Sequence, residues 1–461
     1  MNSSWQLAID ITYIFIFMLI AKLIKEKLGI FKSIIVPTSL LAGFIGVILG
    51  QEVLGWVWFN QDFYENLVYH GLGIGFIALT LSNQSKQQGR DSVNSGLFII
   101  SSYCFQGVLG MIIISLLMMT IKPDLFFGLG LILPLAYGQG PGFASNIGAT
   151  WDATLGIGYA NQYGLTLATV GFLVGGILGL ILLNIIVYHK NIKVNRLRTL
   201  DGLHYKELTL TSVKEINFFD NLTTQIVWIS VIYFLTLTTM HYTSVFLSTL
   251  GNIGQTVGGL INGFNYLFGI LYAILFKVIM GGLNKKGHRT LELMDGYIMH
   301  NISSLAFHVM ITCSVLAISF SVVKEYWEVL IAISIGGAIG TLAFVIVFGK
   351  IAFNRYPWYY ILAMFGMMTG TASTALALLR GVDPELETDV ASNLVLGSAV
   401  AAPLGLPLMV LLALPAISYV NNTRQFYYIA FFGILAYLVL VMSILTLRST
   451  KERRRLNHES K

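Results

Sequence analysis

Two long apolar stretches of this chain are each interrupted by a run of glycine and small polar residues. The first run, Tyr137–Asn146, reads YGQGPGFASN, and the second, Gly366–Ala375, reads GMMTGTASTA. Such a run is unfavourable in a continuous membrane helix, because it tends to break the helix. Every backbone group left unpaired in hydrocarbon costs several kcal/mol unless protein, water or a ligand satisfies it. Helices broken at matching places in two halves of a chain are typical of the binding sites of membrane transporters.

The composition predicts an all-α polytopic membrane protein surrounded by membrane lipids. Of the 461 residues, 56% are hydrophobic and only 11% are charged, which is too apolar for a soluble core. The two cysteines, Cys104 and Cys313, lie far apart and match neither a disulfide framework nor a zinc site. The net charge of +6 does not indicate a nucleic-acid partner, because the basic residues lie between apolar spans.

Windows long enough to cross about 30 Å of hydrocarbon predict about 11 transmembrane helices. They lie near residues 5–24, 34–51, 66–82, 95–120, 160–188, 224–247, 265–283, 297–320, 328–349, 391–418 and 427–447. The two interrupted stretches, about 125–150 and about 357–380, are left over. We expect each of them to be a re-entrant loop, which dips into the membrane and returns on its own side.

The distribution of basic residues supports this topology. With the N-terminus outside and both interrupted stretches re-entrant, most of the 28 Lys and Arg residues fall in cytoplasmic segments. The outer loops hold only Lys122, Lys324 and Arg424. The positive-inside rule demands this asymmetry, which would collapse if either stretch crossed fully. The sequence therefore predicts a multi-pass protein of the cell (inner or plasma) membrane, with a cytoplasmic C-terminus.

An internal repeat relates the two halves of the chain. A shift of 230 residues places Gly140 on Gly370 and aligns the flanking apolar spans. Each half contains five crossings, so the second half has inverted topology, and the site is expected near the membrane midplane. The predicted organisation is an N-terminal repeat (1–188), a cytoplasmic linker (189–222), an inverted C-terminal repeat (223–420) and an additional transmembrane helix with a basic cytoplasmic tail (421–461).

This arrangement resembles the bacterial sodium/glutamate symporter family, in which two five-helix inverted repeats each carry a Gly-rich re-entrant loop. The resemblance covers about residues 5–420 and is densest at the two interrupted runs, at Gly171 to Gly179 and at Pro403–Pro407. It implies a homodimer with a static scaffold and a moving transport domain, which work by an elevator-type mechanism. It also implies sodium as the coupling ion and no other cofactor. Where the family commonly has a His in the first loop, this chain has Gln139.

The chemistry of the two loops favours a small anionic or zwitterionic substrate. Loops of Gly, Ser and Thr expose backbone N–H groups at half-helix N-termini, where the helix dipole favours negative charge. Neither interrupted core contains a carboxylate, which a site for a cation would be expected to have. The candidate substrate-binding residues are Gly138, Gln139, Gly140, Gly142, Ser145, Asn146, Thr369, Gly370, Thr371, Ser373 and Thr374. Arg380 either pairs with a substrate carboxylate or anchors the chain at the interface.

Sodium requires oxygen ligands, and the candidates are the hydroxyls of Ser145, Thr369, Thr371 and Ser373. The structural alternative is that these small residues serve only to let neighbouring helices pack closely. Two such loops at matching repeat positions favour the functional interpretation.

The leading hypothesis is a sodium-coupled symporter for glutamate or a related small dicarboxylate or amino acid. A proton-coupled organic-anion carrier on the same architecture is the nearest alternative. An ion channel with a filter of backbone carbonyls is a third, although two loops from opposite faces suit alternating access better. We do not expect an enzyme, because the sequence offers no nucleophile with a base, no metal spacing and no nucleotide loop.

Overall fold

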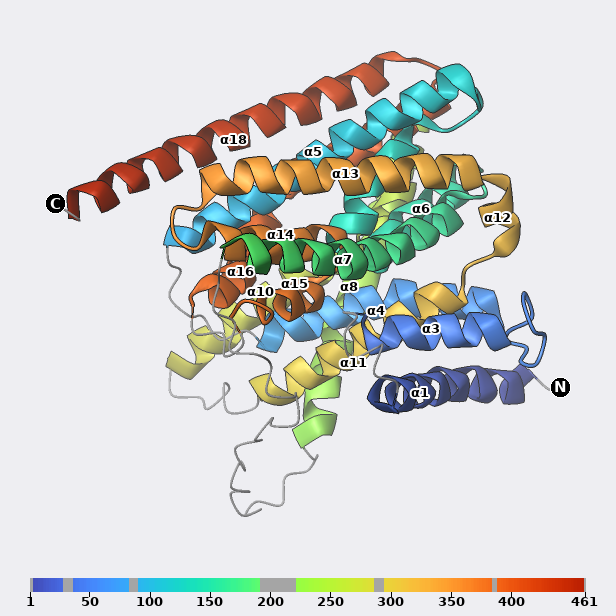
Figure 1. Ribbon diagram of the computed structural model, residues 1–461. Coiled ribbons are helices and arrows are strands. Elements are labelled where there is room, and N and C mark those ends of the chain that lie inside the picture. Colours follow the sequence, from blue (N-terminus) through green and yellow to red (C-terminus); the bar gives the residue numbers. More distant parts are fainter. Residues whose placement is uncertain are drawn as a thin grey trace, which may run out of the picture.

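The protein is a bundle of helices that mostly run side by side (Figure 1). The structure, a computed structural model, describes residues 3–27, 36–82, 90–190, 221–285, 294–383 and 388–459. Every regular element within these ranges is a helix. The all-helical class predicted from the sequence is therefore confirmed for this part of the chain. Most of the predicted linker 189–222 lies outside the described residues.

Eight spans of the described chain are long and apolar enough to cross a membrane, as a polytopic membrane protein requires. They are formed by α1 (Ser3–Lys27), α5 (Arg90–Thr120), α7 (Ala160–Lys190), α8 (Asn221–Ser248), α9 (Asn252–Ile261) continued by η3 (Asn262–Phe264) and α10 (Asn265–Lys285), α11 (Gly296–Leu316), α13 (Trp327–Ala352) and α18 (Gln425–Glu459). Each corresponds to a span predicted from hydropathy.

Three predicted spans differ in detail. The span 391–418 is two helices, α16 (Val390–Leu404) and α17 (Leu406–Val420), which meet at an angle of 50°. Pro403 and Pro407 flank this bend, and proline disrupts the regular hydrogen bonding of a helix. The spans 34–51 and 66–82 correspond to α3 (Thr38–Leu49) and α4 (Gln61–Ser82). With 12 residues, α3 is only about 18 Å long.

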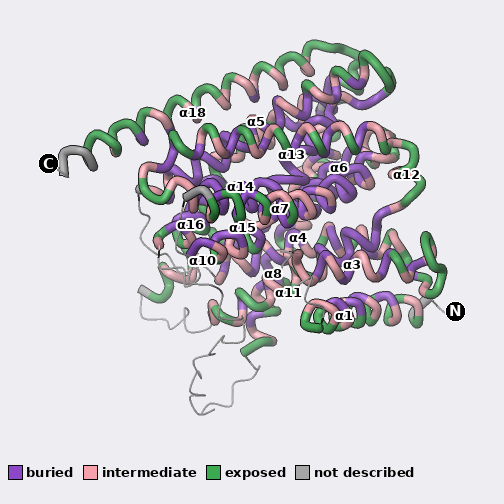
Figure 2. The backbone as a smooth tube through the Cα atoms, viewed as in Figure 1, coloured by how far each residue is buried: buried purple, intermediate pink, exposed green. Residues whose placement is uncertain are grey.

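The helices form two layers (Figure 1). The α4–α11 layer contains α1, α3, α4, α8, α10 and α11, with α4 packed along α11. The α5–α13 layer contains α5, α7, α13, α16 and α18, together with the shorter helices at its centre. In Figure 2 the buried residues lie at the middle of the bundle. Trp151, Tyr163 and Phe365 are among the largest fully buried side chains.

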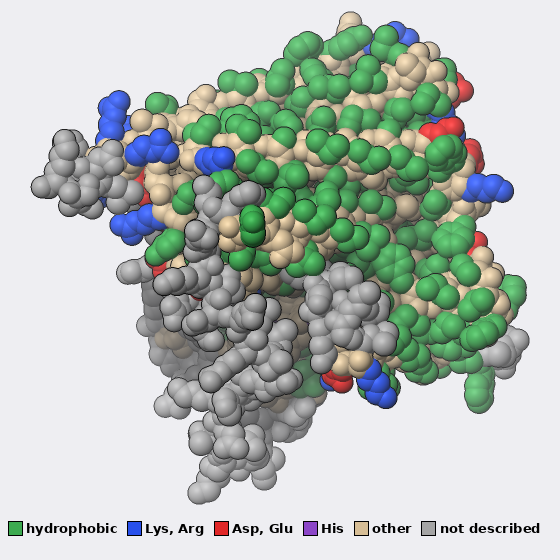
Figure 3. Space-filling view, viewed as in Figure 1, with side chains coloured by type: hydrophobic (Ala, Val, Ile, Leu, Met, Phe, Trp, Pro, Cys, Tyr) green, Lys and Arg blue, Asp and Glu red, His purple; other side chains and the backbone are tan. Residues whose placement is uncertain are grey.

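The outer surface of the bundle is apolar. Large side chains such as Phe234, Val410 and Leu447 are more than 60% exposed. In Figure 3, hydrophobic side chains cover the middle of the visible face, whereas charged side chains gather near its edges. Such an extensive exposed apolar surface is expected where lipid replaces water as the solvent.

Both interrupted stretches are broken helices. The first broken segment consists of η1 (Phe127–Leu131), a π-helical turn η2 (Pro134–Gln139) and α6 (Pro141–Leu155). Its break is Gly140, whose φ of +90° favours glycine. The second broken segment consists of α14 (Pro357–Thr369) and α15 (Ala372–Leu379), and its break is Gly370 with Thr371.

Each broken segment doubles back on itself. In the first, the rings of Phe126 and Trp151 are 5.1 Å apart, so the two ends of the segment lie together. In the second, a Cβ atom on Gly366 would lie 3.0 Å from the backbone of Ala375. The break is therefore the tip of each segment, and the two ends form its base.

The two bases lie at opposite ends of α13. Tyr159, which follows the first segment, stacks on Tyr326 at the start of α13, with 4.2 Å between ring centroids. Tyr360 in the second segment stacks on Phe353 at the end of α13, at 3.9 Å. Since α13 has 26 residues and is about 39 Å long, the segments approach the centre of the bundle from opposite sides.

The last turns of α18 dock on the chain that leads into the second broken segment. The Asn354 side-chain amide donates to the carbonyl and hydroxyl oxygens of Ser449 at 3.0 and 3.1 Å, and its oxygen accepts from Arg453 Nε at 3.1 Å. The Arg448 Nε also donates to the side-chain oxygen of Asn94 in α5, at 3.3 Å. The predicted basic tail therefore forms the C-terminal turns of α18.

We expect Asn354→Ala to increase the rate of hydrogen exchange over residues 446–455 about tenfold. The substitution removes the side-chain hydrogen bonds of Asn354 with Ser449, Glu452 and Arg453, and each contributes on the order of 1 kcal/mol, part of which water replaces. Hydrogen-exchange mass spectrometry of the purified protein measures this. Thr446→Ala is the control, since its hydroxyl bonds only to Ser443 in the same helix. Equal exchange in both variants would contradict the docking.

Candidate functional site

Helix α5 holds the tips of both broken segments. The Tyr103 hydroxyl donates to the carbonyl oxygen of Gly138 at 3.0 Å, and Gln106 Nε2 donates to the carbonyl oxygen of Met368 at 2.8 Å. Gly138 and Met368 are 230 residues apart, which is the offset of the predicted repeat. Two carbonyl groups, each just before a break and matched by the predicted repeat, are therefore bonded by side chains one turn apart on one helix. We call Tyr103, Gln106 and residues 138–140 and 368–371 the tip junction.

Helix α7 passes close to both tips because it has glycine where they meet. A Cβ atom on Gly171 would lie 2.9 Å from the Thr369 carbonyl oxygen and 2.9 Å from the Tyr137 ring. A Cβ atom on Gly175 would lie 2.9 Å from Thr369 Oγ1.

The middle of α13 lies on the other side of the junction. The Tyr137 hydroxyl donates to the carbonyl oxygen of Ser334 at 2.9 Å, and Gln106 Nε2 also contacts Thr341 Oγ1 at 3.0 Å. Ser334 and Thr341 are central residues of this helix. The junction therefore lies about halfway between the two bases.

Three buried side-chain oxygens at the junction have no hydrogen-bond partner within the described ranges. They are Gln106 Oε1, Ser334 Oγ and Thr374 Oγ1. Gln106 Oε1 lies 3.2 Å from the position of a Cβ on Gly138, and Thr374 Oγ1 lies 2.9 Å from that on Gly370, so each faces a tip. Buried polar groups are normally satisfied by protein, water or a ligand.

A new helix starts after each break. Gly140 precedes α6 and Thr371 precedes α15, and neither residue caps its helix with a side-chain hydrogen bond. The first N–H groups of a helix lack partners in their own helix and carry a partial positive charge. Together with the three oxygens, the junction offers both hydrogen-bond donors and acceptors.

The structure brings several of the predicted site residues together at the junction. They are Gly138, Gln139, Gly140, Thr369, Gly370, Thr371 and Thr374. The Gln139 side chain is half-buried. The Thr369 hydroxyl donates to the carbonyl oxygen of Phe365 in its own helix, at 2.7 Å.

Other predicted residues in α6 lie away from the junction. A Cβ atom on Gly142 would lie 2.6 Å from Leu72 in α4. The Asn146 amide donates to Asn265 Oδ1 in α10 at 2.8 Å. These two residues therefore pack against the α4–α11 layer. The Ser145 hydroxyl instead donates to Asn161 Oδ1 in α7, at 2.7 Å.

Ser373 and Arg380 are exposed. Arg380 follows the last turn of α15, nine residues after Thr371, so it lies about 13 Å from the tip along that helix. The structure places it near the base of the second segment, since a Cβ on the adjacent Gly381 would meet Leu183 near the end of α7.

The predicted sodium ligands are not gathered at one point. Ser145 bonds to Asn161 of α7, whereas Thr369 lies against Gly171 and Gly175 of the same helix. At least ten residues of α7, about 15 Å, separate these contacts. The hydroxyls of Ser145 and Thr369 therefore do not meet around one ion.

Sequence reasoning missed Tyr103, Gln106, Ser334 and Thr341, which all lie in predicted membrane spans. The sequence did contain a signal for Gln106. A strongly polar side chain inside an apolar span is costly, and its presence there suggests a functional role. No family model, curated protein or solved structure matches this chain. The functional argument therefore rests on the geometry of the tip junction.

Proposed function

We propose that this protein is a secondary active transporter and that the tip junction binds its small anionic or zwitterionic substrate. The observation that carries the proposal is the meeting of the two helix breaks on one turn of α5, beside buried oxygens that have no hydrogen-bond partner among the residues that the structure describes. The position of the two bases at opposite ends of α13 supports the interpretation of the segments as the re-entrant hairpins of an inverted repeat.

The proposed activity is sodium-coupled symport of glutamate or a related small dicarboxylate or amino acid. The resemblance of the two loops to the bacterial sodium/glutamate symporters supports sodium and this substrate class. The distribution of Lys and Arg supports an outer N-terminus and a cytoplasmic C-terminus. In agreement with this orientation, the start of α1 and the end of α18 lie at opposite sides of the bundle (Figure 1).

The two layers support an elevator-type movement. The α5–α13 layer carries the tip junction and is the proposed transport domain, and the α4–α11 layer is the proposed scaffold of a homodimer. Where α6 meets the scaffold, the contact is largely aromatic, with the ring of Phe143 4.3 Å from Tyr266 and 5.4 Å from Phe76. Apolar contacts have no fixed direction and allow sliding, whereas the hydrogen bonds between the layers, such as Asn146 to Asn265 and Gln162 to Ala317, would have to break during the movement.

Uptake of labelled glutamate into proteoliposomes tests the proposal. We expect saturable uptake under an inward sodium gradient and none after sodium is replaced by choline. Saturable uptake under a proton gradient alone would identify the proton-coupled organic-anion carrier instead. If the protein takes up neither glutamate, aspartate nor succinate under either gradient, or if single-channel currents appear, the proposed symport is wrong.

A further inference from the structure

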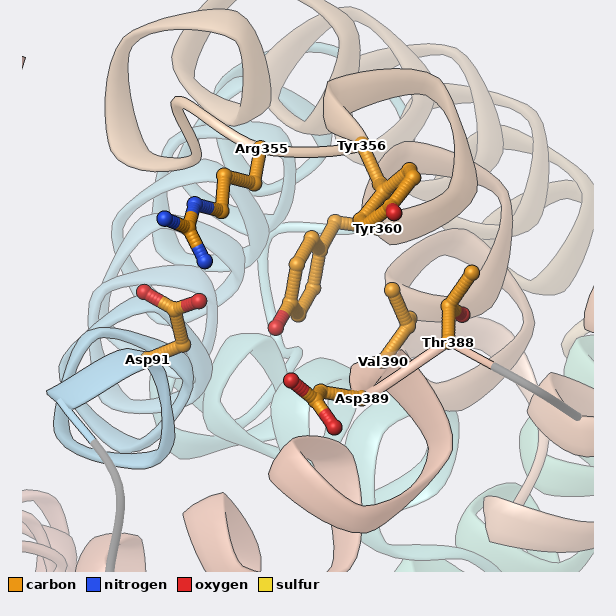
Figure 4. Close-up of a pocket in the computed structure, with 7 residues that line it drawn as sticks. All are labelled: Asp91, Arg355, Tyr356, Tyr360, Thr388, Asp389 and Val390. Carbon is orange, nitrogen blue, oxygen red and sulfur yellow. The ribbon is translucent and has the colours of Figure 1, made fainter. Parts of the chain in front are cut away.

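A charged cavity of about 390 Å³ lies at the base of the second broken segment (Figure 4). Its walls come from the start of α5, from the chain before and within α14, and from the chain before α16. The lining residues are Asp91, Arg355, Tyr356, Tyr360, Thr388, Asp389 and Val390. Tyr360 precedes Thr369 by nine residues of α14, about 14 Å, so the cavity is separate from the tip junction.

The cavity presents charges of both signs. In Figure 4 the Arg355 guanidinium faces the Asp91 carboxylate, and the Asp389 carboxylate lies on the other side of the Tyr360 hydroxyl. Both Arg355 and Asp389 are solvent-exposed. The lining has two carboxyl groups and one guanidinium, and the Glu452 carboxyl of α18 lies against Asp91.

The wall between these charges is fixed in place. The Tyr360 ring stacks on Phe353 with an interplanar angle of 4°, and its hydroxyl oxygen accepts a hydrogen bond from Asn393 Nδ2 at 2.9 Å. The Asn393 side-chain oxygen in turn accepts from the Ser92 hydroxyl in α5, at 2.8 Å. Because the Tyr360 oxygen accepts from Asn393, its own O–H is available to donate into the cavity. Preorganised polar groups of this kind favour binding.

We propose that this cavity is a second ligand site, which binds a small zwitterion with one ammonium and one carboxylate group, as in a free amino acid. The carboxylate is held by the planar guanidinium of Arg355 and by the Tyr360 hydroxyl. The ammonium group lies between Asp91 and Asp389. The volume lies within the range of small-molecule sites, about 300 to 1,000 Å³.

Two other ligand classes fit this lining less well. A dicarboxylate would bring a second negative charge to a cavity that already has two carboxylates and only one cation. A metal cation or a simple amine would leave Arg355 facing a positive charge. Only a ligand that carries one positive and one negative group complements both the carboxyl groups and the Arg355 guanidinium. The inference goes beyond the proposed transport and does not depend on it.

The cavity joins both ends of the second broken segment to α5. Arg355 and Tyr360 lie at the first end of the segment, Asp389 follows its second end, and Asp91 starts α5. A ligand that contacts all three walls would hold the base of this segment against the helix that holds its tip.

Equilibrium binding to the purified full-length protein in detergent tests this site. The probes are labelled L-alanine and L-serine as zwitterions, succinate as a dicarboxylate and propylamine as a simple cation. We expect saturable binding of the zwitterions, and we expect Arg355→Gln and Asp389→Asn each to weaken it at least tenfold. Arg424→Gln, in a loop far from the cavity in sequence, is the matched charge control and is expected to bind as the unmodified protein does.

Gln106→Leu separates this site from the tip junction. Zwitterion binding that survives Gln106→Leu but is lost in Arg355→Gln supports the cavity, whether or not the protein transports glutamate. Binding that is lost in Gln106→Leu and retained in both cavity variants would assign the ligand to the tip junction and overturn the proposal. Absence of zwitterion binding, or equally tight binding of propylamine, would also overturn it. Tyr360→Phe, which removes only a hydroxyl, is expected to weaken binding in a folded protein if Arg355→Gln proves unstable.

Discussion

Replacing Gln106 with leucine is expected to reduce the initial rate of substrate uptake at least 100-fold while the protein stays folded. Leucine fills a similar volume, but it cannot donate to the Met368 carbonyl or to Thr341. A buried carbonyl without a partner costs about 1 to 3 kcal/mol, and the loss of a ligand contact adds to this. Since about 1.4 kcal/mol corresponds to a factor of ten, the sum reaches two orders of magnitude.

Uptake into proteoliposomes measures this effect, with protein recovery and size-exclusion behaviour as checks on folding. The matched control is Ser115→Ala on the same helix, because that hydroxyl bonds only to the Met111 carbonyl of its own helix. We expect it to leave uptake unchanged. Uptake by Gln106→Leu within threefold of the unmodified protein would show that the tip junction is not the substrate site.

The second large effect concerns stability, and it is expected for Gly110→Ala. A Cβ atom on Gly110 would lie 2.0 Å from the carbonyl oxygen of Gly130 in the first broken segment. The obstacle is backbone, so the new methyl group can be accommodated only if α5 and that segment separate. Overpacking of this kind costs about 1 to 3 kcal/mol, and more where backbone must move. We therefore expect a loss of about 3 kcal/mol, seen as a lower midpoint of thermal unfolding in detergent.

Gly107→Ala is the matched control for this substitution. Gly107 lies one turn away on the same helix and faces the same segment, but its nearest neighbour, Leu131 Cδ2, would be 3.5 Å from the new Cβ. That is an ordinary contact, and alanine is about 0.5 to 1 kcal/mol better than glycine within a helix. We expect Gly107→Ala to be neutral or slightly stabilising. Equal unfolding midpoints for the two variants would contradict the close approach of α5 to η1.

The parts of the fold that depend on local signals were predictable from the sequence. Apolar runs long enough to cross a bilayer predict the long helices, because hydropathy acts over about twenty consecutive residues. The glycines at 140 and 370 predict both breaks, because a helix cannot keep its hydrogen bonds through such runs. The bend at Pro403 also had a local signal, and the prediction of one continuous span there did not use it.

The contacts that depend on the direction of a side chain could not be predicted from hydropathy. Ser145 and Asn146 follow the first break closely in sequence, yet the turn of α6 directs their side chains to Asn161 and Asn265. Conversely, Gln106 is more than 30 residues from the first break along the chain and reaches both tips only because α5 packs against both of them. Hydropathy places a residue in a span, but it does not say which neighbour that residue meets.

Tyr103 and Gln106 lie one turn apart on α5, so both tips are held by the same helix. Segments that approach from opposite sides would otherwise have independent degrees of freedom, and each could open while the other stayed closed. Because neighbouring turns of α5 hold equivalent carbonyls of both tips, a displacement of one tip carries the other with it. In the proposed transporter, access to the tip junction is then expected to depend on the position of both tips together against the α4–α11 layer, and not on two gates that open separately.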